Sequence, residues 1–191
     1  MAIYITSDLH FCHNQPFVYE PRGFQSVEKM NIEIVNRINE VVKPEDELWI
    51  LGDLMLNDTA VGIQYMQLLH GKIHLILGNH DTNNRIALYR ERLPNMIIEG
   101  FGARLKYQGY NFYLSHYPSL VENFDREEPL KHQVINLCGH SHTQNWAQDL
   151  DKGLIFHCEV DTNNCYPWNL DEIINIMKGI HEDTIKVRCW K

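Results

Sequence analysis

Polar side chains of the kinds that bind metal ions follow several short apolar runs of this sequence. In the stretch LILGNHDTNN, Asn79, His80 and Asp81 come directly after a glycine. A turn is the simplest interpretation, because Gly, Asn and Asp tolerate turn geometry and Asp81 can cap a following helix. One such turn decides nothing, but the same pattern recurs along the chain and calls for a chemical explanation.

Four other apolar runs end in the same way, as SDLH, LGD, LSH and CGHSH. Asp8 and His10 are two residues apart, as are the two histidines of CGHSH, and residues at that spacing point the same way in an extended segment. Functional groups gather at the carboxyl ends of strands in open α/β sheets, so these side chains are expected to converge. With Asn79 and His80, the set comprises Asp8, His10, Asp53, His116, His140 and His142.

The side-chain types indicate a metal centre without thiolate ligands. Imidazole, carboxylate and amide oxygen together suit divalent ions such as Mn²⁺, Fe²⁺ or Zn²⁺. The set is too large for one ion, and a shared carboxylate can bridge two. Centres with two metal ions are a recurrent solution for the hydrolysis of phosphate esters. Glycine directly before Asp53, Asn79 and His140 lets the chain turn and approach a ligand closely.

Composition bounds the class of protein. The 191 residues suit one domain, 1–191, and 44% apolar residues indicate a globular chain. The net charge of -8 gives no positive field for nucleic-acid polymers or anionic membranes, although bound cations can reverse the potential locally. Five cysteines without zinc-site spacing indicate free thiols in a reducing compartment. The opening MAIYITSDLH does not resemble a secretory signal, so a cytoplasmic location is expected.

Alternating strands and helices are predicted for the first half of the chain. Strands are expected at residues 3–7 and in ELWILGD and KIHLILGNHD. Helices are expected at 26–42 with Ser26 as N-cap, from Asp58 to Leu69, and up to about Arg92. This order predicts a parallel sheet covered by helices.

The second half has closely spaced strand-like segments, namely MIIEGF, ARLKYQ, YNFYLSH, VINLCGH and LIFHCEVD. Gln108 and Gly109 predict a hairpin turn, and Asn169 is expected to cap a last helix that runs through Met177. The fold class predicted from the whole pattern is α/β, with a second and more antiparallel sheet.

The ordered motifs Asp-x-His, Gly-Asp, Gly-Asn-His-Asp, a lone His and Gly-His-x-His resemble the calcineurin-like metallophosphoesterase superfamily. The downstream stretch VDTNNCYPWNLDEI and the opening SDLHFCHN are similar to small single-domain microbial members. The resemblance implies a four-layer α/β/β/α sandwich, in which two facing mixed sheets are flanked by helices.

The resemblance also implies a role for each motif residue. One metal ion would be held by Asp8, His10, Asp53 and His142, and the other by Asp53, Asn79, His116 and His140. His80 would act as acid or electrostatic stabiliser, and Asp81 is the nearest residue to orient it, with a helix cap as the alternative. Protein Ser/Thr phosphatases of the superfamily continue Gly-Asp with Val-Asp-Arg-Gly. This chain has Leu56 and Asn57 at the acid and arginine positions, which disfavours that activity.

The expected function is a phosphoesterase that hydrolyses phosphodiesters or small phosphate esters by attack of a metal-bridged hydroxide. The expected cofactors are two divalent ions, with Mn²⁺ favoured and Fe, Zn²⁺, Ni²⁺ or Mg²⁺ as alternatives. A phosphomonoesterase is the alternative activity, and a non-catalytic scaffold of the same fold is the alternative class.

Substrate contacts are less well marked in the sequence. His13 and Arg22 are candidates, and Arg126 and His132 lie in irregular stretches that can also reach a substrate. The expected partner is a small-molecule phosphate ester. A membrane or a long nucleic acid is not expected, since the chain is acidic and has no basic track. The oligomeric state is left open.

Overall fold

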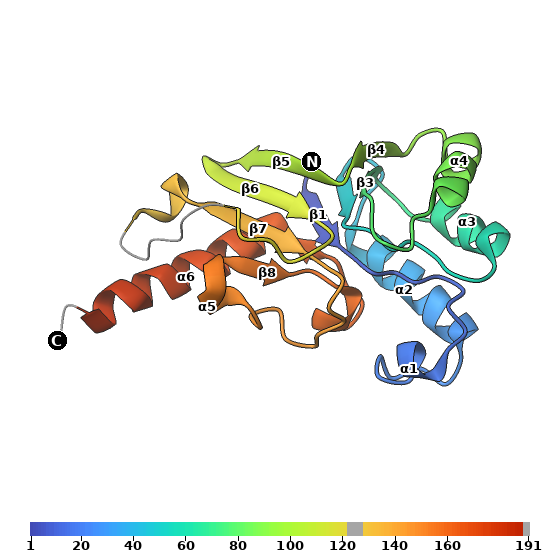
Figure 1. The fold of residues 1–191 in the computed structure, drawn as a ribbon, viewed down its shortest axis with the longest axis horizontal. Helices are drawn as coiled ribbons and strands as arrows, with labels where there is room; N and C mark the ends of the chain where they lie inside the picture. Colours follow the sequence, from blue (N-terminus) through green and yellow to red (C-terminus); the bar gives the residue numbers. More distant parts are fainter. Residues whose placement is uncertain (122–127, 189–191) are drawn as a thin grey trace.

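The computed structural model describes residues 1–121 and 128–188. The first of its two sheets has five strands and contains β1, β3 and β4 of Figure 1. The strand order is β4-β3-β2-β1-β9. Strands β1 to β3 are parallel, as predicted. The segment MIIEGF is predicted to belong to the more antiparallel second half, but its strand β4 joins this first sheet parallel to β3, because the preceding helix returns the chain to the same end. The short β9 pairs antiparallel with β1. The strands are β1 (Ile3–Thr6), β2 (Glu47–Ile50), β3 (Lys72–Ile76), β4 (Ile97–Gly100) and β9 (Trp168–Asn169).

Three helices, α2 (Val27–Val41), α3 (Thr59–Gln67) and α4 (Asn83–Arg92), cover the outer face of this sheet. Both predicted caps are confirmed, since Ser26 accepts from Lys29 N–H at 3.3 Å and Asp58 accepts from Val61 N–H at 3.0 Å. Residues of these helices share one buried cluster with β2 and β3, including Met30, Ile34, Ile38, Ile63, Met66, Ile86, Leu48, Ile50 and Leu75. Burial of this apolar face stabilises the helices on the sheet.

The second sheet has the order β5-β6-β7-β8. Its strands are β5 (Gly102–Tyr107), β6 (Tyr110–Ser115), β7 (Val134–Cys138) and β8 (Ile155–His157). The predicted hairpin joins β5 and β6, with positive φ at Gln108 and Gly109. The prediction of a more antiparallel sheet was wrong for the other two pairings, which are parallel. Crossover segments with η1 (Leu130–His132) and α5 (Leu150–Gly153) return the chain to the same end each time.

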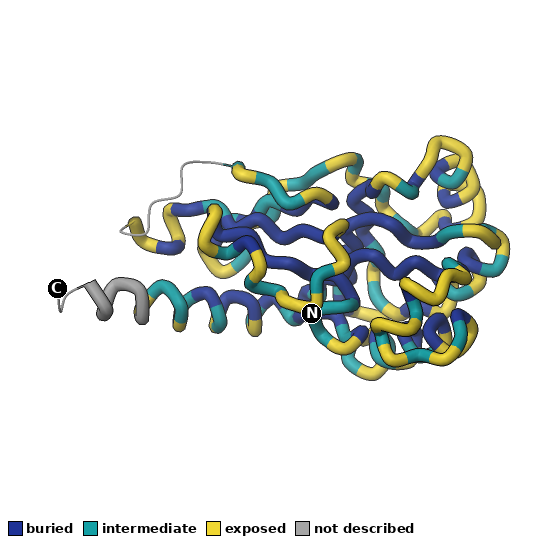
Figure 2. Tube along the Cα trace, turned by 60° about the horizontal axis from the view of Figure 1, so that its bottom comes forward, coloured by how far each residue is buried: buried dark blue, intermediate teal, exposed yellow. Residues whose placement is uncertain are grey.

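A second buried cluster fills the space between the sheets. It unites Ile3, Ile5, Trp49 and Ile76 of the first sheet with Phe112, Leu114, Ile135, Leu137 and Phe156 of the second. Figure 2 shows the strands as the most continuously buried part of the chain. Both sheets are mixed and flanked by helices, which confirms the predicted fold class.

The last helix, α6 (Leu170–Arg188), adds Ile173, Ile174 and Met177 to this second cluster. Asn169 caps its start by accepting the Asp171 N–H at 2.8 Å, as predicted. The predicted end at Met177 was wrong, because the following residues contain no proline and the helix continues beyond the sheets (Figures 1 and 2).

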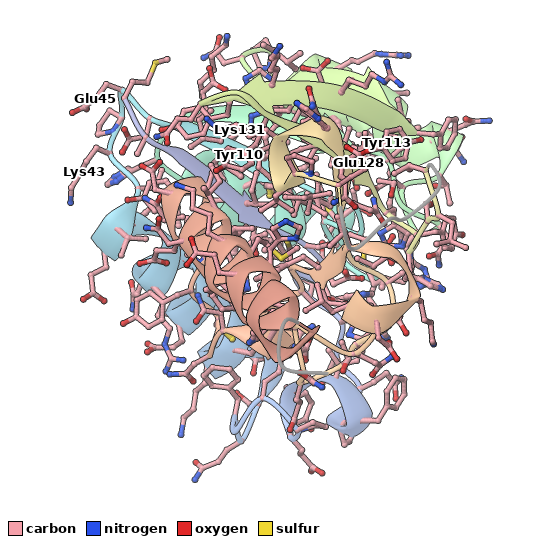
Figure 3. All side chains as sticks on the ribbon, turned by 90° about the vertical axis from the view of Figure 1, so that its left-hand side faces the viewer. Lys43, Glu45, Tyr110, Tyr113, Glu128 and Lys131 are labelled. Carbon is pink, nitrogen blue, oxygen red and sulfur yellow. The ribbon has the colours of Figure 1, made fainter. Side chains whose placement is uncertain are left out.

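At the far end of the second sheet, the Tyr110 ring lies beside two lysine ammonium groups. Lys131 Nζ and Lys178 Nζ are each 5.3 Å from the ring centroid, and Figure 3 labels Tyr110 and Lys131 on this side. These contacts join α6 to β6 at a place remote from the strand ends that carry the motifs. Within the described part of the chain, no helix combines the length and hydropathy needed to cross a bilayer.

Candidate metal centre

The loops that carry the motif residues follow β1, β2, β3, β6 and β7, so the carboxyl ends of both sheets meet at one place. The Asp8 N–H donates to the Gly52 carbonyl oxygen at 3.1 Å, which joins the first loop to the second. Motif residues also adopt left-handed backbone that non-glycine residues rarely take, with φ between 48° and 75° at Asp8, His10, Asp53, His140 and His142. Such backbone persists where the surrounding structure enforces it, and functional sites are the usual place.

Two motif glycines are required by the close approach of these loops rather than by their own backbone angles. A Cβ at Gly78 would collide with Oδ1 of Asp53, and a Cβ at Gly139 would collide with Ser7 Oγ and Asp8 Oδ2. Glycine therefore brings the loops that carry Asn79 and His140 into contact with the buried carboxylates.

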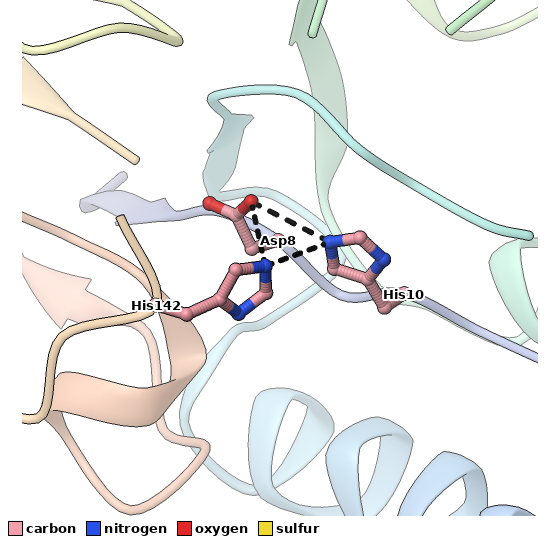
Figure 4. A group of neighbouring side chains, drawn as sticks. All are labelled: Asp8, His10 and His142. Carbon is pink, nitrogen blue, oxygen red and sulfur yellow. Dashed lines mark hydrogen bonds and ion pairs between the residues drawn. The ribbon is translucent and has the colours of Figure 1, made fainter. Parts of the chain in front are cut away.

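Asp8, His10 and His142 form the first donor group (Figure 4). The two Nε2 atoms of the histidines are 3.1 Å apart. Oδ1 of Asp8 lies 3.6 Å from Nε2 of His10 and 3.7 Å from Nε2 of His142. One carboxylate oxygen and two imidazole nitrogens thus face a common point, although the residues come from opposite ends of the sequence.

Asn79, His116 and His140 form the second donor group. Oδ1 of Asn79 is 2.8 Å from His116 Nε2 and 3.0 Å from His140 Nδ1. The two imidazole nitrogens are 3.2 Å apart. An amide oxygen and two nitrogens therefore converge from the loops after β3, β6 and β7.

Asp53 lies between the two donor groups and is 2% exposed. Its Oδ2 is 3.6 Å from His10 Nε2 in the first donor group and 3.6 Å from His116 Nε2 in the second. Its Oδ1 accepts the backbone N–H of His80 at 2.8 Å, which fixes the direction of the carboxylate. One oxygen is thus placed where both groups can share it.

Burial and neighbouring charges shift the pKa values of several of these side chains. Burial alone would raise the pKa of Asp8, but contact with His10 and the charges of His116 and His142 hold it well below its usual range. Burial lowers the pKa of His10, and burial with the neighbouring His116 lowers that of His140. Burial would also lower the pKa of His142, but contact with Asp161 and the charge of Asp8 raise it. Ionised carboxylate and neutral imidazole are the forms that bind metals. Within the described residues, the buried Asp8 Oδ1 accepts no hydrogen bond, so its lone pairs are available to a cation.

His80 stands beside both groups without joining either. Its side chain is 39% exposed, and its Nε2 is 3.9 Å from Oδ2 of Asp53. Its ring centroid is 5.5 Å from that of His10. The Arg85 guanidinium donates to the His80 carbonyl oxygen, which holds the loop. The imidazole is therefore partly exposed to solvent beside the centre.

Asp81 differs from both sequence interpretations. Its Oδ2 accepts the N–H groups of Asp53 and Gly78, each at 2.9 Å, and its Oδ1 accepts the hydroxyl of Tyr89 at 3.0 Å. These contacts direct the carboxylate to the backbone of two loops rather than to the His80 ring. The N-cap of α4 is Thr82, so Asp81 does not cap that helix. Asp81 takes this position because the loop after β2, distant in sequence, directs the N–H groups of Asp53 and Leu54 toward its carboxylate.

The predicted substrate contacts have mixed placements. His13 Nδ1 is 3.2 Å from Nδ1 of His10, on the side of that ring away from the donor group. The Arg22 side chain is 1% exposed and directs its nitrogens inward, to Asp161 and to backbone carbonyls, instead of toward a substrate. His132 is 70% exposed and is paired with Glu128 at 3.5 Å. Arg126 lies outside the described residues.

Sequence reasoning missed Asp161 and Glu159, which support the loop that carries His140 and His142. Asp161 Oδ2 is 3.3 Å from His142 Nδ1, and Glu159 Oε1 accepts the Ser141 N–H at 3.0 Å. Both acids follow the apolar run LIFHC. The rule that exposed the other motifs, acidic or imidazole side chains after an apolar run, also applies to them.

Comparisons with known proteins agree with this geometry. A family model described as the calcineurin-like phosphoesterase superfamily domain matches residues 1–157. An uncharacterised protein of Methanocaldococcus jannaschii is 31% identical over 183 residues, which are 92% of this chain and 91% of the relative. The symmetrical bis(5'-nucleosyl)-tetraphosphatase of Buchnera aphidicola is 34% identical over 91 residues, which are 47% of this chain and 27% of that enzyme.

Among solved structures, a protein of unknown function from Aquifex aeolicus is similar in fold. It superposes with a TM-score of 0.69 at 24% sequence identity, covering 92% of this chain and 98% of its own. The arrangement of two mixed sheets with flanking helices is therefore shared along nearly the whole length of both chains.

Proposed function

This chain belongs to the calcineurin-like phosphoesterase superfamily, and from that premise we propose that it is a hydrolase that uses two divalent metal ions to cleave phosphodiesters or small phosphate esters. The observation that carries the proposal is Asp53, whose Oδ2 lies 3.6 Å from a nitrogen of each donor group. In the proposed assignment, Asp53 is shared, Asp8, His10 and His142 complete one site, and Asn79, His116 and His140 complete the other.

When bound there, such ions would lower the pKa of bound water, to about 7 in the case of Zn²⁺, and would neutralise charge on the phosphate oxygens. The mixture of imidazole, carboxylate and amide oxygen favours Mn²⁺, with Fe, Zn²⁺, Ni²⁺ or Mg²⁺ as alternatives. The buried carboxylates of Asp8 and Asp53 supply two negative charges inside the centre. They balance part of the charge of the cations and so favour their retention.

His80 is proposed to donate a proton to the leaving-group oxygen. Its ring is partly exposed, and its backbone N–H donates to Asp53 Oδ1, which fixes the residue beside the centre. Asp81 contributes by holding the backbone of Asp53 and Gly78, and thus the spacing between the two loops. A proton donor within reach of the leaving group contributes about 10²–10⁴-fold to the rate.

Two exposed aromatic rings, one near each donor group, favour a phosphodiester over a phosphomonoester as the substrate. Phe17 is 71% exposed and its ring centroid is 5.7 Å from that of His13. Tyr117 is 50% exposed and its ring centroid is 4.6 Å from that of His140. A diester carries a substituent on each side of its phosphorus, and these rings offer each substituent an apolar contact. A monoesterase would use only one of them.

The test is a turnover screen of the metal-reconstituted protein on matched aryl phosphodiesters and phosphomonoesters. The proposal predicts metal-dependent hydrolysis with a higher kcat/KM for the diester. A higher value for the monoester would support the alternative activity. Two bound ions without hydrolysis of either ester would support the non-catalytic scaffold.

A further inference from the structure

The guanidinium of Arg22 lies inside the protein directly behind the first donor group. It donates to both carboxylate oxygens of Asp161, Nε to Oδ1 and Nη2 to Oδ2, each at 2.9 Å. Nη2 also donates to the Asp8 carbonyl oxygen at 2.9 Å, and Nη1 donates to that of Leu9 at 3.2 Å. The side chains of Arg22 and Asp161 are 1% and 8% exposed. A bidentate pair at such low exposure has a rigid geometry.

The same carboxylate reaches a predicted metal ligand. Oδ2 of Asp161 is 3.3 Å from Nδ1 of His142, while Nε2 of that ring faces His10 and Asp8 in the first donor group. A carboxylate that accepts a hydrogen bond from Nδ1–H keeps the ring proton on Nδ1 and leaves the lone pair of Nε2 for a metal ion. It also fixes the ring plane and raises the basicity of the imidazole.

We propose that Arg22 and Asp161 are positioning residues that set the orientation and tautomer of His142 and hold the Asp8–His10 loop against it, and thereby determine the metal affinity of the first donor group. The inference rests on the proposed function, which assigns a metal ion to that group. It assigns a role to Arg22, which the sequence suggested as a substrate contact, and to Asp161, which the sequence did not single out.

The sequence positions of Arg22, Asp161 and their partners favour a role in holding two loops together. Arg22 and Asp161 are 139 residues apart, so no local requirement of a turn or helix explains their pairing. Arg22 donates to the backbone of the loop with Asp8, and both Asp161 Oδ2, at 3.3 Å, and Arg22 Nη2, at 3.5 Å, lie beside Nδ1 of His142. The pair therefore connects the two loops that must approach each other to form the first donor group.

The test uses Asp161→Asn, which keeps the shape, and Arg22→Lys, which keeps the charge but loses the bidentate geometry. Arg37→Ala is the matched control. Arg37 Nη1 donates to the backbone and side-chain oxygens of Asn164, in the same stretch as Asp161, and Arg37 has no recorded contact with either donor group in the described structure. Stepwise Co²⁺ binding is followed by calorimetry and by the visible absorption spectrum of the bound ion.

Both variants are expected to weaken one of the two Co²⁺ sites by about 10–100-fold and to alter its spectrum, while the other site is unchanged. Arg37→Ala is expected to leave both sites unchanged. Equal weakening by Arg37→Ala, or unaltered Co²⁺ binding in Asp161→Asn, would overturn the inference. Circular dichroism of the metal-free proteins checks the fold, and Asp161→Asn decides the outcome if Arg22→Lys does not fold.

A second measurement separates an action through His142 from general loosening. In a His142→Ala background, Asp161→Asn is expected to weaken Co²⁺ binding by a smaller factor than in the wild type, because its contact with the imidazole is gone and only the hold of Arg22 on the Asp8 loop remains to be lost. A full effect in that background would overturn the inference. Since metal affinity is the readout, wild-type protein that binds two ions but hydrolyses no ester would refute the proposed function and leave this inference standing.

Discussion

The two donor groups are built from similar side chains but are supported differently. In the first donor group, the outward nitrogen of each histidine meets another side chain, His13 at 3.2 Å from His10 and Asp161 at 3.3 Å from His142. In the second donor group, His116 Nδ1 meets the backbone carbonyl oxygen of Leu51 at 2.8 Å. Both histidines of the first group are therefore oriented by side chains, whereas His116 of the second is oriented by backbone.

The difference teaches where substitution can act. The carbonyl oxygen of Leu51, directly after β2, cannot be removed by mutation, and the Leu51 N–H donates to the Thr6 carbonyl oxygen of β1 at 2.8 Å. A carboxylate or imidazole can be removed, and it also tunes the basicity of the ligand that it contacts. The first donor group is thus expected to be the more adjustable of the two, while Asp53 couples both.

The largest effect is expected from Asp53→Asn, because this residue lies 3.6 Å from both groups. Metal content should fall from two ions toward none, and turnover should fall by more than the roughly 10⁴-fold that loss of a proton donor can cause. Metal analysis after dialysis and kcat on an aryl diester measure both. Retention of one ion at full affinity would break the picture of a shared carboxylate.

The next largest effect is expected from His80→Ala, which should leave the ligands of both donor groups in place. We expect both ions to remain and kcat to fall by about 10²–10⁴-fold, because the proton donor is lost. The loss should be smaller for a nitrophenyl ester than for an alkyl ester, since nitrophenolate leaves without much protonation. If both esters slow by the same factor, His80 is not the proton donor.

A smaller and selective effect is expected from His13→Ala. Removal of the Nδ1 partner of His10 should weaken only the ion of the first donor group, by about 10–100-fold. His70→Ala is the control, because that histidine contacts the Val42 carbonyl oxygen away from the centre. Titration with Mn²⁺ distinguishes the two ions, and equal weakening of both would remove the proposed asymmetry.

The smallest effect on the metals is expected from Tyr89→Phe, which removes the hydroxyl that donates to Asp81 at 3.0 Å. Tyr89 is fully buried, so the free energy of unfolding should fall by about 1–3 kcal/mol. Urea unfolding of the metal-free protein measures this loss. Tyr166→Phe, which removes an exposed hydrogen bond to Glu40, is the control and should leave the free energy of unfolding nearly unchanged. A comparable loss of stability in both variants would argue against a specific contribution of the hydrogen bond between Tyr89 and Asp81.

Local patterns were sufficient to anticipate the strand ends and the residues that meet there. Apolar runs fix where short strands form, and residues two apart in extended chain point the same way, so Asp8 with His10 could be paired from spacing alone. The caps Ser26, Asp58 and Asn169 were equally local, since each bonds a backbone N–H two or three residues ahead.

The sequence by itself thus determined the fold class and the set of side chains that converge, because both depend on periodicity and on neighbours in the chain. Only the tertiary structure decided the parallel pairing of β6 to β8, the inward direction of Arg22 and the attachment of Asp81 to the loop after β2. Each of these depends on a partner supplied by a distant segment, 139 residues away for Arg22. Burial then selects the contact, since a buried charge must find an opposite charge or a backbone dipole wherever the fold presents one.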